Sequence, residues 1–430
     1  MIVDPPVHRR QWNPFRRVSG GATEPRQEGW CRERKQLDSL TGLRIFAAVW
    51  VMLHHFRDVT PTETWKFPLV DRFILHGLYG VDLFFVLSGF ILSHVYFEQF
   101  NTRISRANFR SFISFRFARL YPVHIVTFLT MVALLLGEMF LTGASSAASE
   151  RYSIPVFISN LTMTQAWWGV ITSPNVPAWS ISAEWFAYLL FPILCVIIAR
   201  LRSAPLIFVV AGCGLATIWH EVTDHLLIRV VAGFLVGMAT YQLSHHSSKL
   251  ARMPWLGTMT VALIGLWATL GGPPRLEIGL LLFAALVLTL GSERDWLCRP
   301  LSLKTIVYLG EVSYAVYMVH WVVRVTIRVA AEKARVLESI PLGLVVAAYV
   351  TVTMLAAILL YHFVERPWRR RLRRMLAPRG TKSPVSGEGE RLPTRGPVRV
   401  GASRWAARAE RTLGVYRKVH SRRACRGRPR

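Results

Sequence analysis

Apolar runs of roughly twenty residues recur along this chain between shorter polar stretches, and a helix of that length can cross a bilayer. By this criterion the sequence predicts about ten membrane spans. They lie near residues 40–57, 79–97, 120–141, 182–199, 204–219, 226–243, 256–271, 277–291, 306–328 and 341–364. The spans at 204–219 and 256–271 are the weakest of these predictions, because each is short and contains glycine. The pattern indicates an all-α, polytopic integral membrane protein.

The positively charged residues are concentrated between the predicted spans and not within them. If the N-terminus is cytoplasmic, most arginines and lysines between the spans fall in loops on the cytoplasmic side, as the positive-inside rule requires. The long loop 143–178 on the opposite side holds only Glu150 and Arg151 as charged residues. We therefore expect both termini to be cytoplasmic.

The two ends of the chain differ in composition from the membrane domain, which we place at residues 37–370. Residues 1–36 are rich in proline and charge and contain no apolar core, which predicts a poorly ordered cytoplasmic extension rather than a signal peptide. Residues 371–430 carry much of the net charge of +27 and are rich in Gly, Pro, Ser and Arg, which predicts a disordered basic tail. Because basic residues directly follow the last span, we expect the tail to touch anionic lipid and do not expect nucleic-acid binding. The five cysteines show no metal-ligand spacing, so no metal site is expected.

Two ionisable residues in the first predicted span carry the strongest functional signal. His55 follows Arg44 by eleven positions, so on a helix the two residues lie only about 20° apart around the axis and about 16 Å apart along it. Ionisable groups inside a span are costly and are candidates for function by default. In the structural alternative, Arg44 extends to the lipid headgroups and His55 marks the opposite interface.

Two carboxylates are predicted on the same outer side of the membrane as His55. Asp82 stands at the start of the second span, and Glu184 stands at the start of the fourth. A carboxylate next to an imidazole fixes its tautomer and raises its basicity, which prepares a general base. We therefore predict a site formed by His55, Asp82 and Glu184. The alternatives are a helix N-terminal acid stabilised by the dipole for Asp82 and a water-facing position for Glu184.

Two arginines precede the third span at its predicted cytoplasmic entry. Arg116 and Arg119 are three residues apart, so they share one face of a helix and can bind phosphate oxygens bidentately. Anchoring by the positive-inside rule is the alternative. Ser180, Tyr314 and His320 are candidates for supporting roles. Tyr314 and His320 fall on one polar stripe of the ninth span, where interfacial packing is the alternative for His320.

Together these segments resemble acyltransferase family 3, a family of bacterial integral-membrane enzymes that O-acylate glycans and some secondary metabolites. The resemblance covers roughly residues 37 to 370 and rests on motifs that occur in the order of the family. They are Arg44 with ten residues before His55, Gly80-Val-Asp-Leu-Phe-Phe-Val-Leu-Ser-Gly-Phe90, Arg116-x-x-Arg119-x-x-Pro122, Trp179-Ser-Ile-Ser-Ala-Glu184, Ser313-Tyr314 with His320, and Glu365-x-Pro367. Each motif is weak alone, and their joint occurrence is specific.

The resemblance implies an enzyme of the bacterial cytoplasmic (inner) membrane with acyl-CoA, in particular acetyl-CoA, as donor and a carbohydrate or glycolipid as acceptor. It implies that Arg44 and His55 are the required pair and that Arg116 and Arg119 bind the phosphates of the donor. We predict that His55 acts as a general base, with one of the two carboxylates orienting it or balancing its charge. A transient acyl-histidine is the alternative route.

Other classes of function stay open from the sequence. A transporter or flippase also uses buried charges, although the chain shows no two halves with paired broken helices. A non-catalytic membrane protein would use the basic tail to recruit lipid or partners. Within the enzyme class, the acyl group could be succinyl or longer, and the acceptor could be a small secondary metabolite such as a macrolide sugar.

Overall fold

The structure is a computed structural model. It describes residues 37–57, 67–142, 153–167, 173–201, 203–221, 226–246, 253–270, 275–334 and 341–376. All regular elements within these ranges are helices, so the predicted all-α class is confirmed. These described residues belong to one compact unit. The predicted extension 1–36 and residues 377–430 of the predicted tail lie outside the described residues.

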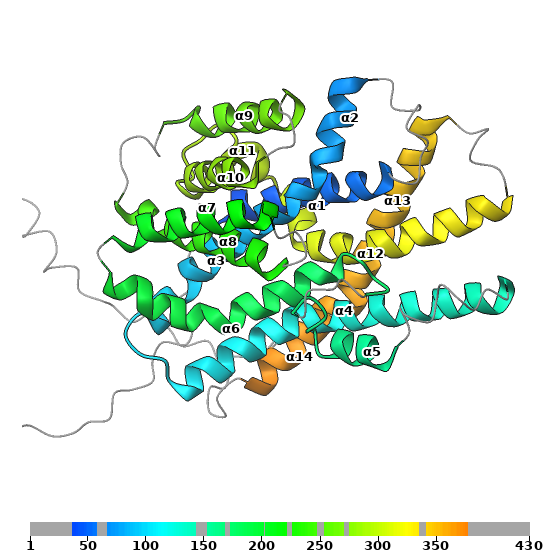
Figure 1. The fold of residues 1–430 in the computed structure, drawn as a ribbon, viewed down its shortest axis with the longest axis horizontal. Helices are drawn as coiled ribbons and strands as arrows, with labels where there is room; N and C mark the ends of the chain where they lie inside the picture. Colours follow the sequence, from blue (N-terminus) through cyan, green and yellow to red (C-terminus); the bar gives the residue numbers. More distant parts are fainter. Residues whose placement is uncertain are drawn as a thin grey trace, which may run out of the picture. The chain divides into compact units, whose positions relative to one another are not determined.

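The helices follow one another along this unit (Figure 1). They are α1 (Asp38–Arg57), α2 (Pro68–Leu75), the 3₁₀ helix η2 (His76–Tyr79), α3 (Gly80–Phe100), α4 (Arg106–Thr142), α5 (Ile154–Leu161), α6 (Ala178–Arg200), α7 (Ala204–Glu221), α8 (Leu226–His246), α9 (Leu256–Leu270), α10 (Leu276–Gly291), α11 (Cys298–Leu301), α12 (Lys304–Ala334), α13 (Leu342–Leu360), the π-helical turn η6 (Tyr361–Glu365) and α14 (Arg366–Leu376).

Seven helical segments within the described ranges are long and apolar enough to cross a membrane, so the chain is a multi-pass membrane protein. These segments are α1, the continuous stretch Pro68–Phe100, α4, α6, α8, α12 and the continuous stretch Leu342–Leu372. Three shorter apolar helices, α7, α9 and α10, occupy the predicted spans at 204–219, 256–271 and 277–291. The predicted number of about ten spans is therefore not confirmed, because these three helices fall below the length of roughly 20 residues that a full crossing needs.

Helix α4 differs most from its prediction. The third span was expected to start near residue 120, but α4 begins at Arg106 and runs through Pro122 as one helix of 37 residues. The polar residues before 120 lower the hydropathy without interrupting the helix. Arg116 and Arg119 therefore lie within a continuous helix and not at its start. At about 1.5 Å per residue, Arg116 lies about 15 Å along the helix from its start, inside the bundle.

Helices α3 and α8 approach each other closely at two glycines. A Cβ atom at position 89 would lie 2.3 Å from the carbonyl oxygen of Phe234, and one at position 237 would lie 2.2 Å from that of Val86. Small residues are the common means by which membrane helices bring their backbones together. This crossing fixes the position of α3, which carries Asp82 and Ser88.

We expect Gly89→Ala to destabilise the protein by roughly 1–3 kcal/mol, because the added methyl group overlaps a backbone carbonyl that cannot turn aside. The matched control is Gly137→Ala on α4, where a Cβ atom would meet no atom within 4 Å. At this position we expect alanine to stabilise the protein by up to about 1 kcal/mol, because alanine has a higher helix propensity than glycine. Thermal unfolding in detergent measures both, and equal melting temperatures for the two variants would contradict the close approach.

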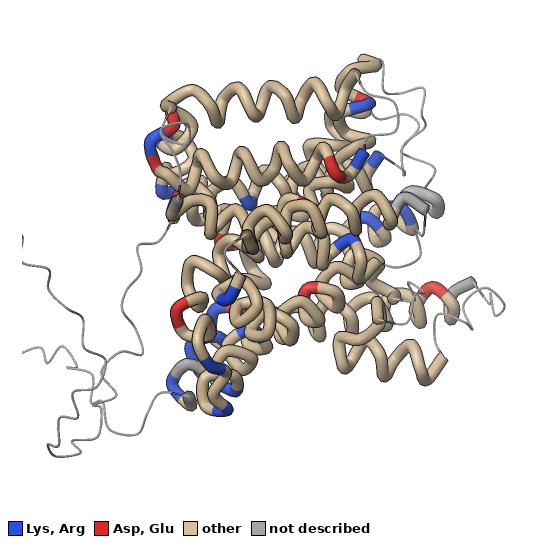
Figure 2. The backbone as a smooth tube through the Cα atoms, turned by 60° about the vertical axis from the view of Figure 1, so that its left-hand side comes forward, with Lys and Arg blue, Asp and Glu red and all other residues tan. Residues whose placement is uncertain are grey.

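Charge is unevenly distributed over these helices. Figure 2 shows that long stretches of the helices carry no charged residue, and that most blue and red positions gather near helix ends. A few charged positions lie within the bundle. Among the charged residues that the sequence singled out, Arg44 on α1 lines an internal cavity and Asp82 on α3 is fully buried.

Candidate active site

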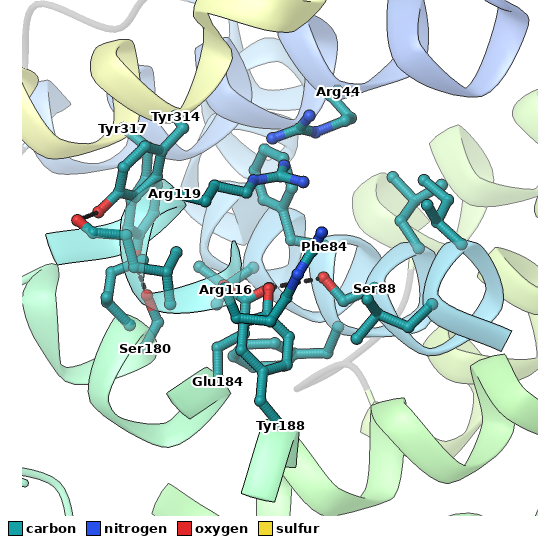
Figure 3. A pocket seen from close by; sticks show the side chains of 17 residues that line it. Arg44, Phe84, Ser88, Arg116, Arg119, Ser180, Glu184, Tyr188, Tyr314 and Tyr317 are labelled. Atoms are coloured by element: carbon teal, nitrogen blue, oxygen red, sulfur yellow. Dashed lines mark hydrogen bonds between the residues drawn. The ribbon is translucent and has the colours of Figure 1, made fainter. Parts of the chain in front are cut away.

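A cavity opens between α1, α3, α4, α6 and α12 (Figure 3). Its volume is about 60 Å³, several times the roughly 10–15 Å³ that a single water molecule requires. The charged and hydroxylated side chains at its wall are Arg44, Ser88, Arg116, Arg119, Ser180, Glu184, Tyr188, Tyr314 and Tyr317. The nine residues come from five different helices, and six of the nine were candidate site residues in the sequence.

Three of the lining residues are arginines. Arg44 comes from α1, and Arg116 and Arg119 come from α4. Figure 3 shows the guanidinium groups of Arg44 and Arg119 turned toward the same space. The Arg116 guanidinium donates to the Tyr96 hydroxyl at 3.2 Å and lies 5.3 Å from the centre of that ring. Because like charges repel strongly where water is scarce, three cations against a single lining carboxylate form a site suited to an anion.

That carboxylate is Glu184. It accepts hydrogen bonds from the Ser88 hydroxyl at 2.8 Å and from the Tyr188 hydroxyl. Glu184 was predicted to lie near His55, but in the structure it lines the cavity of the arginines. Its position balances part of the charge of the arginines. A catalytic role for Glu184 stays a prediction.

The second centre of ionisable groups is a pair of histidines joining α1 and α12. His55 Nδ1 and His320 Nε2 are 3.1 Å apart, and the two rings are stacked with centroids 5.1 Å apart. The Trp321 ring meets His55 edge-on at 5.3 Å. His320 Nδ1 lies 2.6 Å from the backbone carbonyl oxygen of Tyr317. The structure thus gives the supporting candidate His320 a direct contact with the predicted base.

Tyr317 connects the two centres. Its ring lines the cavity and lies 5.7 Å from the ring of His320. Its hydroxyl is 2.7 Å from the hydroxyl of Ser180 and donates to the carbonyl oxygen of Pro177 at 3.0 Å. Tyr314, one helical turn earlier, donates to the carbonyl oxygen of Leu120 at 2.6 Å. The histidine pair therefore adjoins the arginine cavity across a single side chain.

Asp82 has a partner that was not predicted from the sequence, Arg229. Its carboxylate accepts two hydrogen bonds from Arg229 on α8, at 2.8 and 2.5 Å, and both side chains are almost fully buried. The predicted contact between Asp82 and His55 is thus replaced by an ion pair between α3 and α8. The signal for Arg229 was present, since it is an arginine inside the apolar run 226–243.

Aromatic rings enclose this ion pair. The Arg229 guanidinium carbon lies 4.7 Å from the centre of the Trp219 ring, 5.6 Å from Tyr79 and 5.7 Å from Trp179. Cation–π contacts of this kind stabilise a guanidinium that has lost its water. The ion pair and its rings hold α3 against α8.

Within the described residues, the structure holds no cluster of three or more His, Cys, Asp or Glu side chains that could bind a metal ion.

Comparison with known proteins gives one matching family and several relatives. The family model described as "Acyltransferase domain" matches residues 37–362. The chain is 28% identical to "Acyltransferase MdmB" of Streptomyces mycarofaciens over 395 residues, which are 83% of this chain and 98% of that protein. It is 24% identical over 381 residues to "Putative peptidoglycan O-acetyltransferase YrhL" of Bacillus subtilis, covering 79% of this chain and 56% of YrhL. No solved structure matches the chain.

A third relative is "Peptidoglycan O-acetyltransferase OatA" of Listeria monocytogenes, 23% identical over 330 residues, which are 67% of this chain and 49% of OatA. The chain thus spans about half the length of the relatives that are named for peptidoglycan, and nearly the whole length of MdmB.

Proposed function

This chain belongs to the acyltransferase family whose model matches residues 37–362, and we propose that it moves an acetyl group from acetyl-CoA to a hydroxyl group of a carbohydrate. The proposed acceptor is extracytoplasmic or membrane-linked, and the proposed location is the bacterial cytoplasmic (inner) membrane. The observation that carries the proposal is a cavity lined by Arg44, Arg116 and Arg119 beside the contacting pair His55 and His320.

The chemistry of the donor agrees with this cavity. CoA carries a 3′-phosphate and a pyrophosphate at one end of a long pantetheine arm and its thioester at the other. Guanidinium groups bind phosphate oxygens with paired, charge-assisted hydrogen bonds. In our proposal the arginines hold phosphate oxygens, while the thioester reaches toward His55 past Tyr317.

The transfer itself needs one base. A nitrogen of His55 takes the proton of the acceptor hydroxyl, and the oxygen forms a bond to the thioester carbon. The tetrahedral intermediate then collapses, the carbon–sulfur bond breaks, and the CoA thiolate leaves. The proton on His55 passes to that sulfur, so the histidine returns to its starting state and the products are the ester and CoA.

A second candidate acceptor is a small secondary metabolite, such as a macrolide sugar. The observation in its favour is how much of each relative's length this chain matches. The match extends over 98% of MdmB but only 56% of YrhL. The relatives named for peptidoglycan therefore contain a large part to which no residue of this chain is matched.

The proposal is tested by giving membranes that contain the protein [¹⁴C]acetyl-CoA together with a surface-glycan fraction or with macrolide glycosides. Membranes without the protein are the control. Label in the glycan fraction supports the first acceptor, and label only in the glycoside replaces it with the second. Absence of label from both, with acetyl-CoA and with succinyl-CoA, would overturn acyl-CoA as donor.

We expect Arg119→Gln to raise the KM for acetyl-CoA by roughly 10–100-fold, since a hydrogen bond to a charged group is worth about 1.5–3 kcal/mol. Acetyl-pantetheine lacks the nucleotide phosphates, so its KM should not respond to the same substitution. Arg110→Gln is the matched control, because Arg110 is an exposed arginine on the same helix. Equal effects of Arg119→Gln on both donors would place the phosphates elsewhere.

A further inference from the structure

We infer that His320 is a positioning residue that fixes the tautomer of His55 and leaves the Nε2 lone pair of His55 as the base. This inference rests on the proposed function, because it specifies which nitrogen of His55 receives the acceptor proton. The contacts that carry it run from the backbone carbonyl of Tyr317 through His320 to His55.

The first step concerns the proton on His320. Its Nδ1 lies 2.6 Å from the carbonyl oxygen of Tyr317. A carbonyl oxygen can only accept a hydrogen bond, so Nδ1 carries the hydrogen. The side chain is 0% exposed, and burial without a paired anion favours the neutral ring. A neutral imidazole with a hydrogen on Nδ1 has an accepting lone pair on Nε2.

The second step transfers this constraint to His55. The atom facing His320 Nε2 is Nδ1 of His55, at 3.1 Å. Because the lone pair of His320 accepts, His55 Nδ1 must donate and therefore carries the hydrogen. The remaining nitrogen of His55, Nε2, is then unprotonated, which is the state that a general base requires.

The surrounding contacts hold both rings in this arrangement. The Tyr349 hydroxyl donates to the backbone carbonyl of His320 at 3.2 Å, and Arg324 Nε donates to the backbone carbonyl of His55 at 2.7 Å. His54 meets the His55 ring edge-on at 5.1 Å. His54, His320 and Arg324 are thus the titratable or charged groups against His55 in these contacts. Since Asp82 is held by Arg229, His320 performs the orienting function that the sequence assigned to a carboxylate.

The same chain of contacts also supports the charge that catalysis creates. When His55 Nε2 takes the acceptor proton, the ring becomes an imidazolium whose Nδ1–H still points at His320 Nε2. The His320 Nδ1–H in turn points at the Tyr317 carbonyl. Aligned dipoles stabilise the positive charge until the proton moves to the leaving sulfur.

Substitutions at position 320 separate an orienting role from a packing role. Glutamine places its amide near the position of the imidazole Nε2 and keeps an acceptor for His55. Asparagine is shorter and places its amide near the position of Nδ1, and leucine offers no acceptor. We expect His320→Leu and His320→Asn to lower kcat by at least about 10-fold, and up to the 10²–10⁴-fold that a general base supplies. We expect His320→Gln to keep most of kcat, and the KM for acetyl-CoA to stay unchanged in all three variants.

The matched control is His124 on α4. It is also 0% exposed, and its Nε2 lies 2.7 Å from the backbone carbonyl oxygen of Asn160. We expect His124→Leu to leave kcat unchanged in the folded protein. If His320→Leu keeps full kcat while His55→Ala loses it, the orienting role is wrong and the proposed base stands. If His320→Gln falls as far as His320→Leu, His320 acts by packing and the inference is overturned.

The tautomers of the two histidines can also be measured without substrate, so this test does not depend on knowing the acceptor. The ¹⁵N resonances of protonated and unprotonated imidazole nitrogens are well separated in frequency, so spectra of the purified labelled protein report each tautomer. We expect a hydrogen on Nδ1 of both His55 and His320, and a mixture of tautomers at His55 in His320→Leu. A hydrogen on Nε2 of His55 in the unsubstituted protein would overturn the inference even if the proposed function holds.

Discussion

Replacing His55 with alanine should lower kcat by roughly 10²–10⁴-fold, the range that general-base catalysis contributes. The substitution removes the only side-chain nitrogen that the proposed mechanism uses to accept the acceptor proton. The ring is partly exposed and packs against the rings of His54, His320 and Trp321. We therefore expect the variant to reach the membrane in normal amount. Transfer of label from [¹⁴C]acetyl-CoA, normalised to protein in the membrane, measures the loss.

Two comparisons make this result specific. His124→Ala makes the same chemical change at a buried histidine of α4 and should leave kcat within about twofold, since His124 is not among the cavity-lining residues and its Nε2 is engaged by the backbone carbonyl of Asn160. The KM for acetyl-CoA should be unchanged in His55→Ala, because in the proposed mechanism the arginines, and not the histidine, bind the donor phosphates. A fully active His55→Ala variant would show that His55 is structural.

The second large effect is expected from Asp82→Asn, which should destabilise the protein by about 3–5 kcal/mol. The substitution leaves the Arg229 guanidinium without its counter-charge, although both side chains are no more than 2% exposed. The aromatic rings around Arg229 offset only part of that cost, since one cation–π contact is worth about 0.5–2 kcal/mol. Thermal unfolding in detergent and the yield of folded protein measure the loss.

An ion pair near the surface supplies the control. Arg57 and Asp71 form a hydrogen-bonded pair with side chains 17% and 22% exposed. We expect Asp71→Asn to cost no more than about 1 kcal/mol, because solvent screens an exposed pair. If Asp71→Asn and Asp82→Asn lowered the free energy of unfolding equally, burial would not determine the strength of the Asp82–Arg229 pair.

A double substitution separates stability from catalysis at Asp82. Replacing both partners with apolar residues, Asp82→Leu with Arg229→Met, removes the buried charges together and should restore most of the stability. If the restored protein transfers acetyl groups, Asp82 supports the fold only. If it is stable and inactive, the catalytic role predicted from the sequence stands.

The sequence could predict those parts of the site that depend on position along a single helix. Arg44 and His55 share one stripe of α1, and Arg116 and Arg119 share one face of α4, because helical periodicity alone sets these relations. Seven of the predicted spans, which coincide with long apolar helices, were likewise readable from apolar runs. The length of α4 was not, because a hydropathy window ends where arginines begin, whereas backbone hydrogen bonds continue through them.

Pairings between helices could not be derived in this way. Asp82 and Arg229 are 147 residues apart, and His55 and His320 are 265 residues apart. Which of several polar side chains meets another depends on the rotation and depth of each helix, and these are set by contacts such as Gly89 against Phe234. The sequence therefore placed Asp82, Glu184 and His55 in one cluster, while the folded chain assigns them to three different sets of partners.

The separation of Asp82 from Arg229 also has a consequence for biosynthesis. A ribosome adds roughly 5–20 residues per second, so the 147 residues between them take on the order of 10–30 s to synthesise. For that interval α3 is complete and its carboxylate lacks the guanidinium of Arg229. The nascent chain must keep Asp82 in contact with water, headgroups or the insertion machinery until α8 emerges. The order in which the helices leave the translocation site thus decides when this acid becomes part of the bilayer interior.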